Sequence, residues 1–229
     1  MTDIIDLHTH TVASMHAYST IREMATAAKE KGLALLGISD HAPAMPGTFH
    51  EIYFHNFKVI GHASYGVEIM MGAELNVMDE TGRVDLPEKV LKKLHYGIAS
   101  LHDLVIAPGS TAENTAALVG AMKNTYVNII GHPDNPAYPV DVDALARAAA
   151  AEHVLIEMNN SSHDPHGSRQ AVTLSHAICS PPVAVTAHIS SSGVTRTSTQ
   201  TSGNTAIHTP SSRRSDSPPR LPSTMIPHG

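Results

Sequence analysis

The stretch "DIIDLHTH", residues 3–10, is a short apolar run that ends in a His-x-His pair. Such a run predicts a buried β-strand, in which side chains two residues apart point to the same face. His8 and His10 would then lie side by side at the end of the strand, where the two rings can share one metal ion or bridge two. His16 follows shortly afterwards. The open question is whether later parts of the chain complete a metal site.

Apolar stretches and helical segments alternate along the first 160 residues. A capping box, Thr20-Ile-Arg-Glu23, opens a predicted helix that stops at Gly32. Further helices are predicted for residues 110–124 and 141–152, and further strands for residues 33–39, 67–75, 96–100, 127–132 and 153–160. Continuous apolar strands that alternate with helices indicate an α/β fold with a parallel sheet or barrel.

Successive predicted strands end in residues that can bind metal. The strand ends carry, in chain order, His8 with His10, Asp40 with His41, Glu74, His102 and His132, at intervals of 28 to 33 residues. One strand plus one helix with its loops has this length, and the carboxyl ends of parallel strands in a β/α barrel meet at one face. We therefore expect these side chains to gather at one rim, with Asp6 placed to orient a histidine ring from behind.

Imidazole and carboxylate ligands without thiolate suit zinc, manganese or iron. The only cysteine is Cys179, so no site built from several thiolates is available. Two or more cations close together would clamp a phosphoryl group and activate water, which favours a hydrolase. A single histidine at a strand end is more often a cap or a surface residue, so this prediction depends on the joint pattern.

Other features of the same region are expected to lie outside the metal site. His50, His55, His62 and His95 do not follow the strand ends and are expected in solvated loops or helices, and His153 is expected to be structural. Residues 42–57 are predicted to form a long loop near the site, a candidate substrate lid whose aromatic residues serve packing.

Charge and composition disfavour several function classes. The chain has 229 residues, 41% of them hydrophobic, which is enough for one domain with a substantial core. Its net charge of −6 disfavours nucleic acid as a partner. Asp3 and Asp6 stand where a signal peptide carries basic residues, and no apolar run has membrane-spanning length. We therefore expect a cytoplasmic protein without a membrane partner.

The motifs of this sequence resemble those of a known family. In order and spacing, "DLHTHTVAS", "HAYST", "GISDHAP", "GAELNV", "SLH", "IIGHP" and "IEMNNSS" are similar to the PHP (polymerase and histidinol phosphatase) superfamily, and most similar to its bacterial stand-alone probable phosphatases. The resemblance covers about residues 1–162. It implies a distorted (β/α)7 barrel with up to three metal ions, usually zinc, that hydrolyses phosphate esters. By position, it implies as metal ligands His8, His10, His16, His41, Glu74, His102 and His132.

The end of the chain departs from the family pattern, which closes with a further strand and an Asp-x-His within a Gly-Ser-Asp-Ser-His-type motif. After residue 160 the only Asp-x-His is Asp164-Pro165-His166, with no strand before it. We therefore predict an incomplete PHP domain at residues 1–170 and a tail at residues 171–229. Of the 59 tail residues, 28 are Ser, Thr or Pro, a composition typical of disorder. Codons allowed for "SGVTRT" (192–197) read Gly-Ser-Asp-Ser-His in another frame, so we hypothesise a frameshift.

The leading function is a metal-dependent phosphatase in which multinuclear metal-activated water hydrolyses a small phosphorylated substrate. No catalytic residue is assigned beyond the ligands. One alternative is a catalytically impaired metal-binding remnant of such an enzyme, because the closing strand and its ligands are missing. Another is a histidinol-phosphatase-like or nuclease-like activity. The sequence does not determine whether the protein forms a homo-oligomer.

Overall fold

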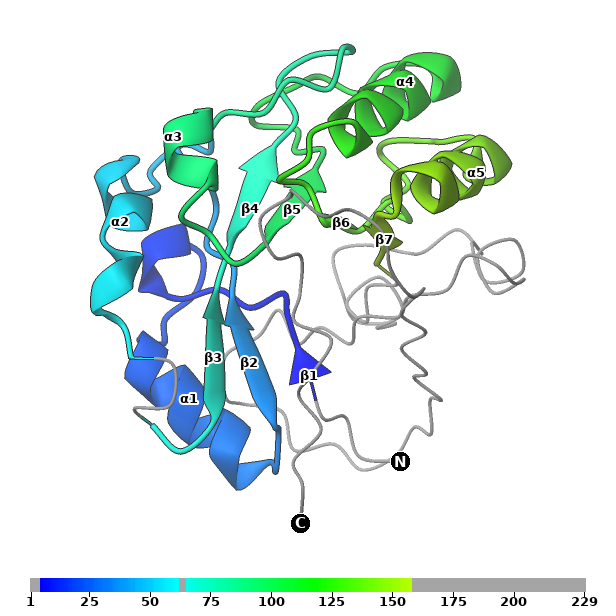
Figure 1. Cartoon of the computed structure of the whole chain (residues 1–229). Helices are drawn as coiled ribbons and strands as arrows, with labels where there is room; N and C mark the ends of the chain where they lie inside the picture. The colour runs from blue at the N-terminus through cyan, green and yellow to red at the C-terminus, as the bar shows by residue number, and fades with distance from the viewer. Residues whose placement is uncertain (1–4, 62–64, 158–229) are drawn as a thin grey trace.

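Parallel β-strands form the centre of the molecule, whose computed structural model describes residues 5–61 and 65–157. One parallel sheet contains β1 (Ile5–Asp6), β2 (Leu35–Ile38) and β3 (Glu68–Met71), and a second contains β4 (Ala73–Asn76), β5 (Gly97–Ser100), β6 (Ile129–Ile130) and β7 (Leu155–Ile156) (Figure 1). Strand order follows chain order in both sheets, so connections within each sheet are crossovers. The predicted α/β fold with parallel strands is confirmed.

Three longer helices match the predicted ones and begin where the sequence provides caps. They are α1 (Ile21–Glu30), α4 (Thr111–Met122) and α5 (Val142–Glu152). Thr20 and Glu23 form the predicted capping box of α1, and Ser110 forms a second one at α4. These side chains satisfy backbone N–H groups that the first helical turn leaves free, so the local sequence determines where the helices start.

Short helical elements occupy segments for which the sequence predicted no helix. They are η1 (Val12–Ser14), α2 (Ile52–His55), η2 (Phe57–Val59) and α3 (Glu88–Leu91). The prediction of one long loop at residues 42–57 is wrong in this respect. Phe54 is 0% exposed and Phe57 is 6% exposed, so burial of these two rings fixes α2 and η2 against the core. The expected packing role of aromatic residues in this segment is confirmed for both.

The two sheets are joined by backbone contacts at Gly72, the residue between β3 and β4. The Gly72 N–H donates to the carbonyl of Ile38 at 2.7 Å, and the Glu74 N–H donates to the carbonyl of Asp40 at 3.1 Å. A parallel bridge between His41 and Glu74 continues the pairing. The chain after β2 thus lies beside both β3 and β4. Among the described residues no strand ladder joins β1 to β7, and the closed barrel stays a prediction.

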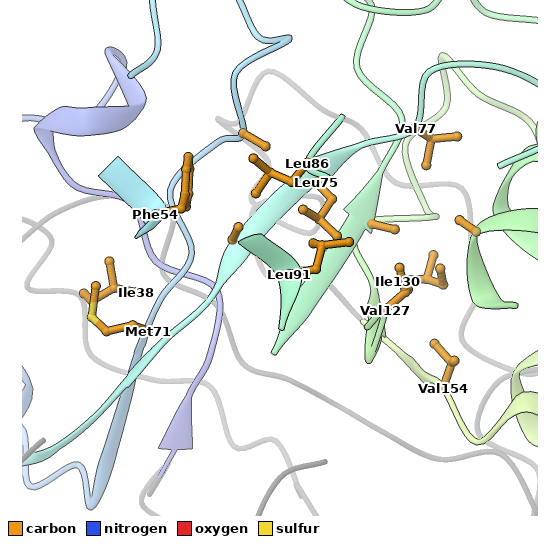
Figure 2. Close-up of a cluster of buried hydrophobic side chains, with 14 of the residues drawn as sticks. Ile38, Phe54, Met71, Leu75, Val77, Leu86, Leu91, Val127, Ile130 and Val154 are labelled. Carbon is orange, nitrogen blue, oxygen red and sulfur yellow. The ribbon is translucent and has the colours of Figure 1, made fainter. Parts of the chain in front are cut away.

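The larger hydrophobic cluster lies between the strands and the helices. Figure 2 shows Ile38 of β2 next to Met71 of β3, and Leu75 of β4 near Leu91 of α3. Ile38 and Leu75 are fully buried. Burying a side chain of this size contributes about 1.5–3 kcal/mol, so this layer anchors the helices to the outer face of the sheets.

A smaller cluster, formed by Leu7, Leu35, Met70, Tyr96, Ile98 and Ile129, packs on the opposite face of the strands. Tyr96 donates its hydroxyl to the carbonyl of Leu7 at 2.6 Å. Its ring also lies against Gly72, where an added Cβ would come within 2.6 Å of ring carbons. Gly72 is therefore required for close packing of the ring at the point where the two sheets meet.

Several predictions fall outside the described residues, among them the domain boundary at residue 170, the tail, and Asp164 with His166. These remain predictions. None of the helices within residues 5–61 and 65–157 has the length and apolar character needed to cross a membrane.

Candidate metal centre

The seven predicted ligands gather at the carboxyl ends of the strands. Glu74 lies within β4, and the others follow β1 (His8, His10), η1 (His16), β2 (His41), β5 (His102) and β6 (His132). All are buried except His16, which is exposed. The expectation that strand-end residues meet at one rim is therefore realised for this whole set. Asp40, the remaining strand-end residue, is also fully buried beside them.

The carboxylate of Glu74 is the centre of the cluster. Its Oε2 lies 3.3 Å from His8 Nε2, 3.4 Å from His10 Nε2 and 2.8 Å from His41 Nδ1. Its Oε1 lies 3.2 Å from His102 Nε2 and 2.9 Å from His132 Nε2. Because each oxygen faces a separate group of nitrogens, this carboxylate can bridge two cations.

His16 extends the cluster on its exposed side. Its Nε2 lies 2.8 Å from His41 Nε2, and its ring centre lies 4.8 Å from that of His10. Three sets of ligand atoms lie within 4.8 Å of one another: His10 with His16 and His41, His8 with His10 and Glu74, and His41 with Glu74 and His102. The sets share members, which is the arrangement expected when several ions have common ligands.

Glu157, the residue after β7, is part of the site, and sequence reasoning missed it. It is 0% exposed, its Oε1 lies 3.0 Å from His8 Nδ1, and its Oε2 accepts the backbone N–H of His132. Asp6 was predicted to orient a histidine ring, but it accepts the backbone N–H of His8 at 3.4 Å. The ring of His8 is contacted by Glu157 instead. The available signal was its position. Glu157 is an acidic residue within the predicted strand at residues 153–160, and it lies 25 residues after His132.

Asn76 orients the ring of His102. The side-chain amide of Asn76 donates from Nδ2 to Asp85 at 2.7 Å and to the carbonyl of Ala42 at 3.1 Å. Its oxygen, 2.7 Å from His102 Nδ1, must therefore accept from that nitrogen. With the proton on Nδ1, the Nε2 lone pair of His102 faces Glu74.

Burial and charge act in opposite directions on the pKa values of the centre. Burial raises the pKa of Glu74, but the surrounding histidines, His8 above all, hold it well below its usual range. Burial lowers the pKa of His8, but Glu157 and Glu74 together raise it well above the ordinary value. For His10 burial prevails and the pKa is well below the ordinary value. An ionised Glu74 and a neutral His10 are the forms that bind metal.

The donor set and its spacing fit metal ions. Bonds from zinc to nitrogen or oxygen are about 2.0–2.2 Å long, so two ligands of one ion lie about 3–3.5 Å apart. The contacts of Glu74, between 2.8 and 3.4 Å, are close to this spacing. His41 Nδ1 and Glu74 Oε2 are buried 2.8 Å apart, yet neither forms a hydrogen bond. A cation between them would remove the cost of burying both.

Other histidines in the described part of the chain have contacts away from this centre. His95 accepts the backbone N–H of Met71 at 2.8 Å, His55 lies 2.9 Å from Lys93 Nζ, and His153 ends α5 with a φ of 57°. His50 is exposed. The placements of His50, His55 and His153 agree with the expected surface or structural roles, whereas His95, expected to be solvated, is half-buried against Met71. His62 lies outside the described residues.

Known proteins share both the sequence motifs and the fold. The profile of the PHP domain family matches residues 6–161. A probable phosphatase of Caldanaerobacter subterraneus is 55% identical over 160 residues, which cover 69% of this chain and 63% of the relative. A probable phosphatase of Clostridium novyi is 50% identical over 159 residues, which cover 69% and 65%. The chain thus spans just under two thirds of the length of these relatives.

A solved structure shares the fold at low sequence identity. Histidinol phosphate phosphatase from Lactococcus lactis, in complex with zinc, L-histidinol and phosphate, superposes with a TM-score of 0.55 at 14% identity. The superposition covers 83% of this chain and 86% of that protein.

The parallel sheets, with several histidines around one buried glutamate at the strand ends, place the chain among α/β proteins whose strand ends can bind metal. Within this class, the chain belongs to the PHP domain family, because the family profile matches more than half of its length. The resemblance inferred from the motifs is confirmed, and the chain is similar to proteins named probable phosphatases.

Proposed function

We propose that the chain is a metal-dependent phosphatase that hydrolyses phosphate monoesters of small molecules. The observation that carries this proposal is the buried carboxylate of Glu74, with five imidazole nitrogens within 3.4 Å. Shared family membership with probable phosphatases supports it. The proposed ligands are His8, His10, His16, His41, Glu74, His102 and His132, for up to three zinc ions, with manganese or iron as alternatives.

The proposed architecture is a distorted (β/α)7 barrel within residues 1–170. Zinc bound at its rim would supply Lewis acidity at phosphoryl oxygens and activate water for attack on phosphorus. The protein would hold the ligands in place: Glu157 and Asn76 fix the rings of His8 and His102, and burial excludes bulk water. The exposed position of His16 leaves that side open to a phosphate group.

The first experiment measures the metal content of the full chain and its hydrolysis of an aryl phosphate. We expect bound zinc, manganese or iron, loss of phosphate release after treatment with a chelator, and recovery when zinc is added back. A chain that holds no metal at this centre, or that releases phosphate equally well after chelation, would contradict the proposal.

A catalytically impaired metal-binding remnant is the second candidate, because this sequence lacks the Gly-Ser-Asp-Ser-His-type motif that the family resemblance implies. The same assay separates the candidates, because a remnant would bind metal without releasing phosphate. Histidinol phosphate and a single-stranded oligonucleotide belong in the assay as further substrates, since histidinol-phosphatase-like and nuclease-like activities predict hydrolysis of one or the other.

A further inference from the structure

A buried hydrogen-bond network lies behind His10 and centres on Asp40, which is 0% exposed. Its carboxylate accepts the backbone N–H of Thr11 at 2.6 Å and the Thr11 hydroxyl at 2.8 Å. It also accepts the hydroxyls of Ser14 and Tyr53, each at 2.7 Å. An ionised carboxylate only accepts hydrogen bonds. The single hydroxyl proton of Ser14 is therefore committed to Asp40.

The remaining contacts of Ser14 determine where the proton of His10 lies. A serine oxygen has two lone pairs besides its proton. One accepts the backbone N–H of His41 at 3.0 Å, and the other lies 2.9 Å from His10 Nδ1. Because Ser14 has no second proton, Nδ1 must be the donor. The Nε2 lone pair of His10 then faces Glu74, 3.4 Å away.

Thr11 makes the direction of this network unique. A backbone N–H only donates, so Asp40 Oδ1 must be an acceptor, and Ser14 donates to this same oxygen. In an Asp40→Asn variant, the amide oxygen would stay at the position of Oδ1. An NH2 group placed there would face the Thr11 N–H, and both groups are donors. The NH2 group of the variant would instead face the hydroxyls of Thr11 and Tyr53, which can turn and accept.

We propose that Ser14, held by Asp40, is a positioning residue that sets the Nδ1–H tautomer of His10 and thereby presents Nε2 to the metal. This inference rests on the proposed metal centre and deepens it. Tyr53 joins the network from α2, so the segment after β2 is attached to the same carboxylate. A hydrogen bond of this kind fixes both the orientation and the basicity of a ligating ring.

Zinc affinity in the full chain, measured by competition with a chelator, tests the role of Ser14. We expect Ser14→Ala to weaken zinc binding by about 10–100-fold, the usual cost of removing such a partner. Ser39→Ala is the matched control, because Ser39 is 0% exposed and donates to the backbone carbonyl of Thr9. This control and Asp40→Asn are expected to retain most of the affinity.

Nitrogen NMR of the histidine rings tests the tautomer without metal or activity. The metal-free wild-type protein is expected to carry the proton of neutral His10 on Nδ1, and Ser14→Ala to mix the two tautomers. Circular dichroism establishes that the variants are folded. If Ser14→Ala fails to fold, the wild-type spectrum and Asp40→Asn still decide the direction of the network.

The outcomes separate this inference from the proposed function. Equal zinc affinity in folded Ser14→Ala and Ser39→Ala would overturn the role of Ser14 and leave the phosphatase proposal standing. A proton on His10 Nε2 in the wild type would do the same. A wild-type chain that binds no zinc, manganese or iron would overturn both.

Discussion

His8 uses its two ring nitrogens for different contacts. Nδ1 lies 3.0 Å from Glu157, and Nε2 lies 3.3 Å from Glu74. Both carboxylates are fully buried. The ring therefore separates two negative charges that would otherwise lie in the same buried space, and its loss affects stability as well as metal binding.

We predict that His8→Ala or His10→Ala abolishes metal binding and any hydrolysis. His8→Ala should also lower the free energy of unfolding by about 3–5 kcal/mol, because it leaves buried carboxylates without their partner. Metal analysis, aryl phosphate hydrolysis and urea denaturation measure these effects. His50→Ala, at an exposed histidine, is the control. Full metal content and an unchanged rate in His8→Ala would show that the ligand assignment is wrong.

The sequence allowed the meeting of the ligands to be predicted, but not the contacts of their rings. Between His41 and His132, successive strand-end ligands are separated by about the length of one strand plus one helix. Parallel strands of this kind bring their carboxyl ends together. The contact between Glu157 and His8 joins residues 149 positions apart. It depends on how closely the ends of β1 and β7 approach, which no local pattern encodes.

Among the elements, the predicted strand at 67–75 is divided into β3 and β4 at Gly72. The sequence predicts one strand there, whereas β3 pairs with β2 and β4 pairs with β5, and the Tyr96 ring lies beside Gly72 between them. The helices α2 and α3 have four residues each, too few for an apolar period to identify them. Long helices with capping residues were predictable because their signals are local.

We predict that Gly72→Ala destabilises the protein by about 1–3 kcal/mol, because the new methyl group overlaps the Tyr96 ring. Urea denaturation measures the change. Tyr96→Leu in the same chain should remove most of the overlap, so the two substitutions should be less than additive. Strict additivity, or an unchanged unfolding midpoint in Gly72→Ala, would contradict the proposed packing.

At the scale of the whole molecule, the proposed metal centre connects strands from both sheets. His8 follows β1 in one sheet, whereas Glu74, His102 and His132 belong to strands of the other or follow them. A metal ion bound by ligands from both sheets stabilises only the folded arrangement. Its binding free energy therefore adds to the free energy of unfolding.

We predict that removing the metal lowers the unfolding temperature. Zinc at 100 times its Kd stabilises the folded state by about 2.7 kcal/mol, which is about 5–10 °C for a chain of this size. Thermal denaturation with zinc and with excess chelator measures the difference. The change should be much smaller in His10→Ala, and an equal shift there would place the metal elsewhere.

The contact between His8 and Glu157 has a consequence for how the chain is made. His8 leaves the ribosome 149 residues before its partner. At about 5–20 residues per second, this delay lasts about 7–30 s. During that interval the partners from β2 to β6, Glu74 among them, emerge one after another, while His8 still lacks Glu157. All seven proposed ligands are available only after His132 is made, and His8 gains its Glu157 partner only after β7. Any ion captured earlier would be held by a subset of the ligands or by a ring that is not yet fixed.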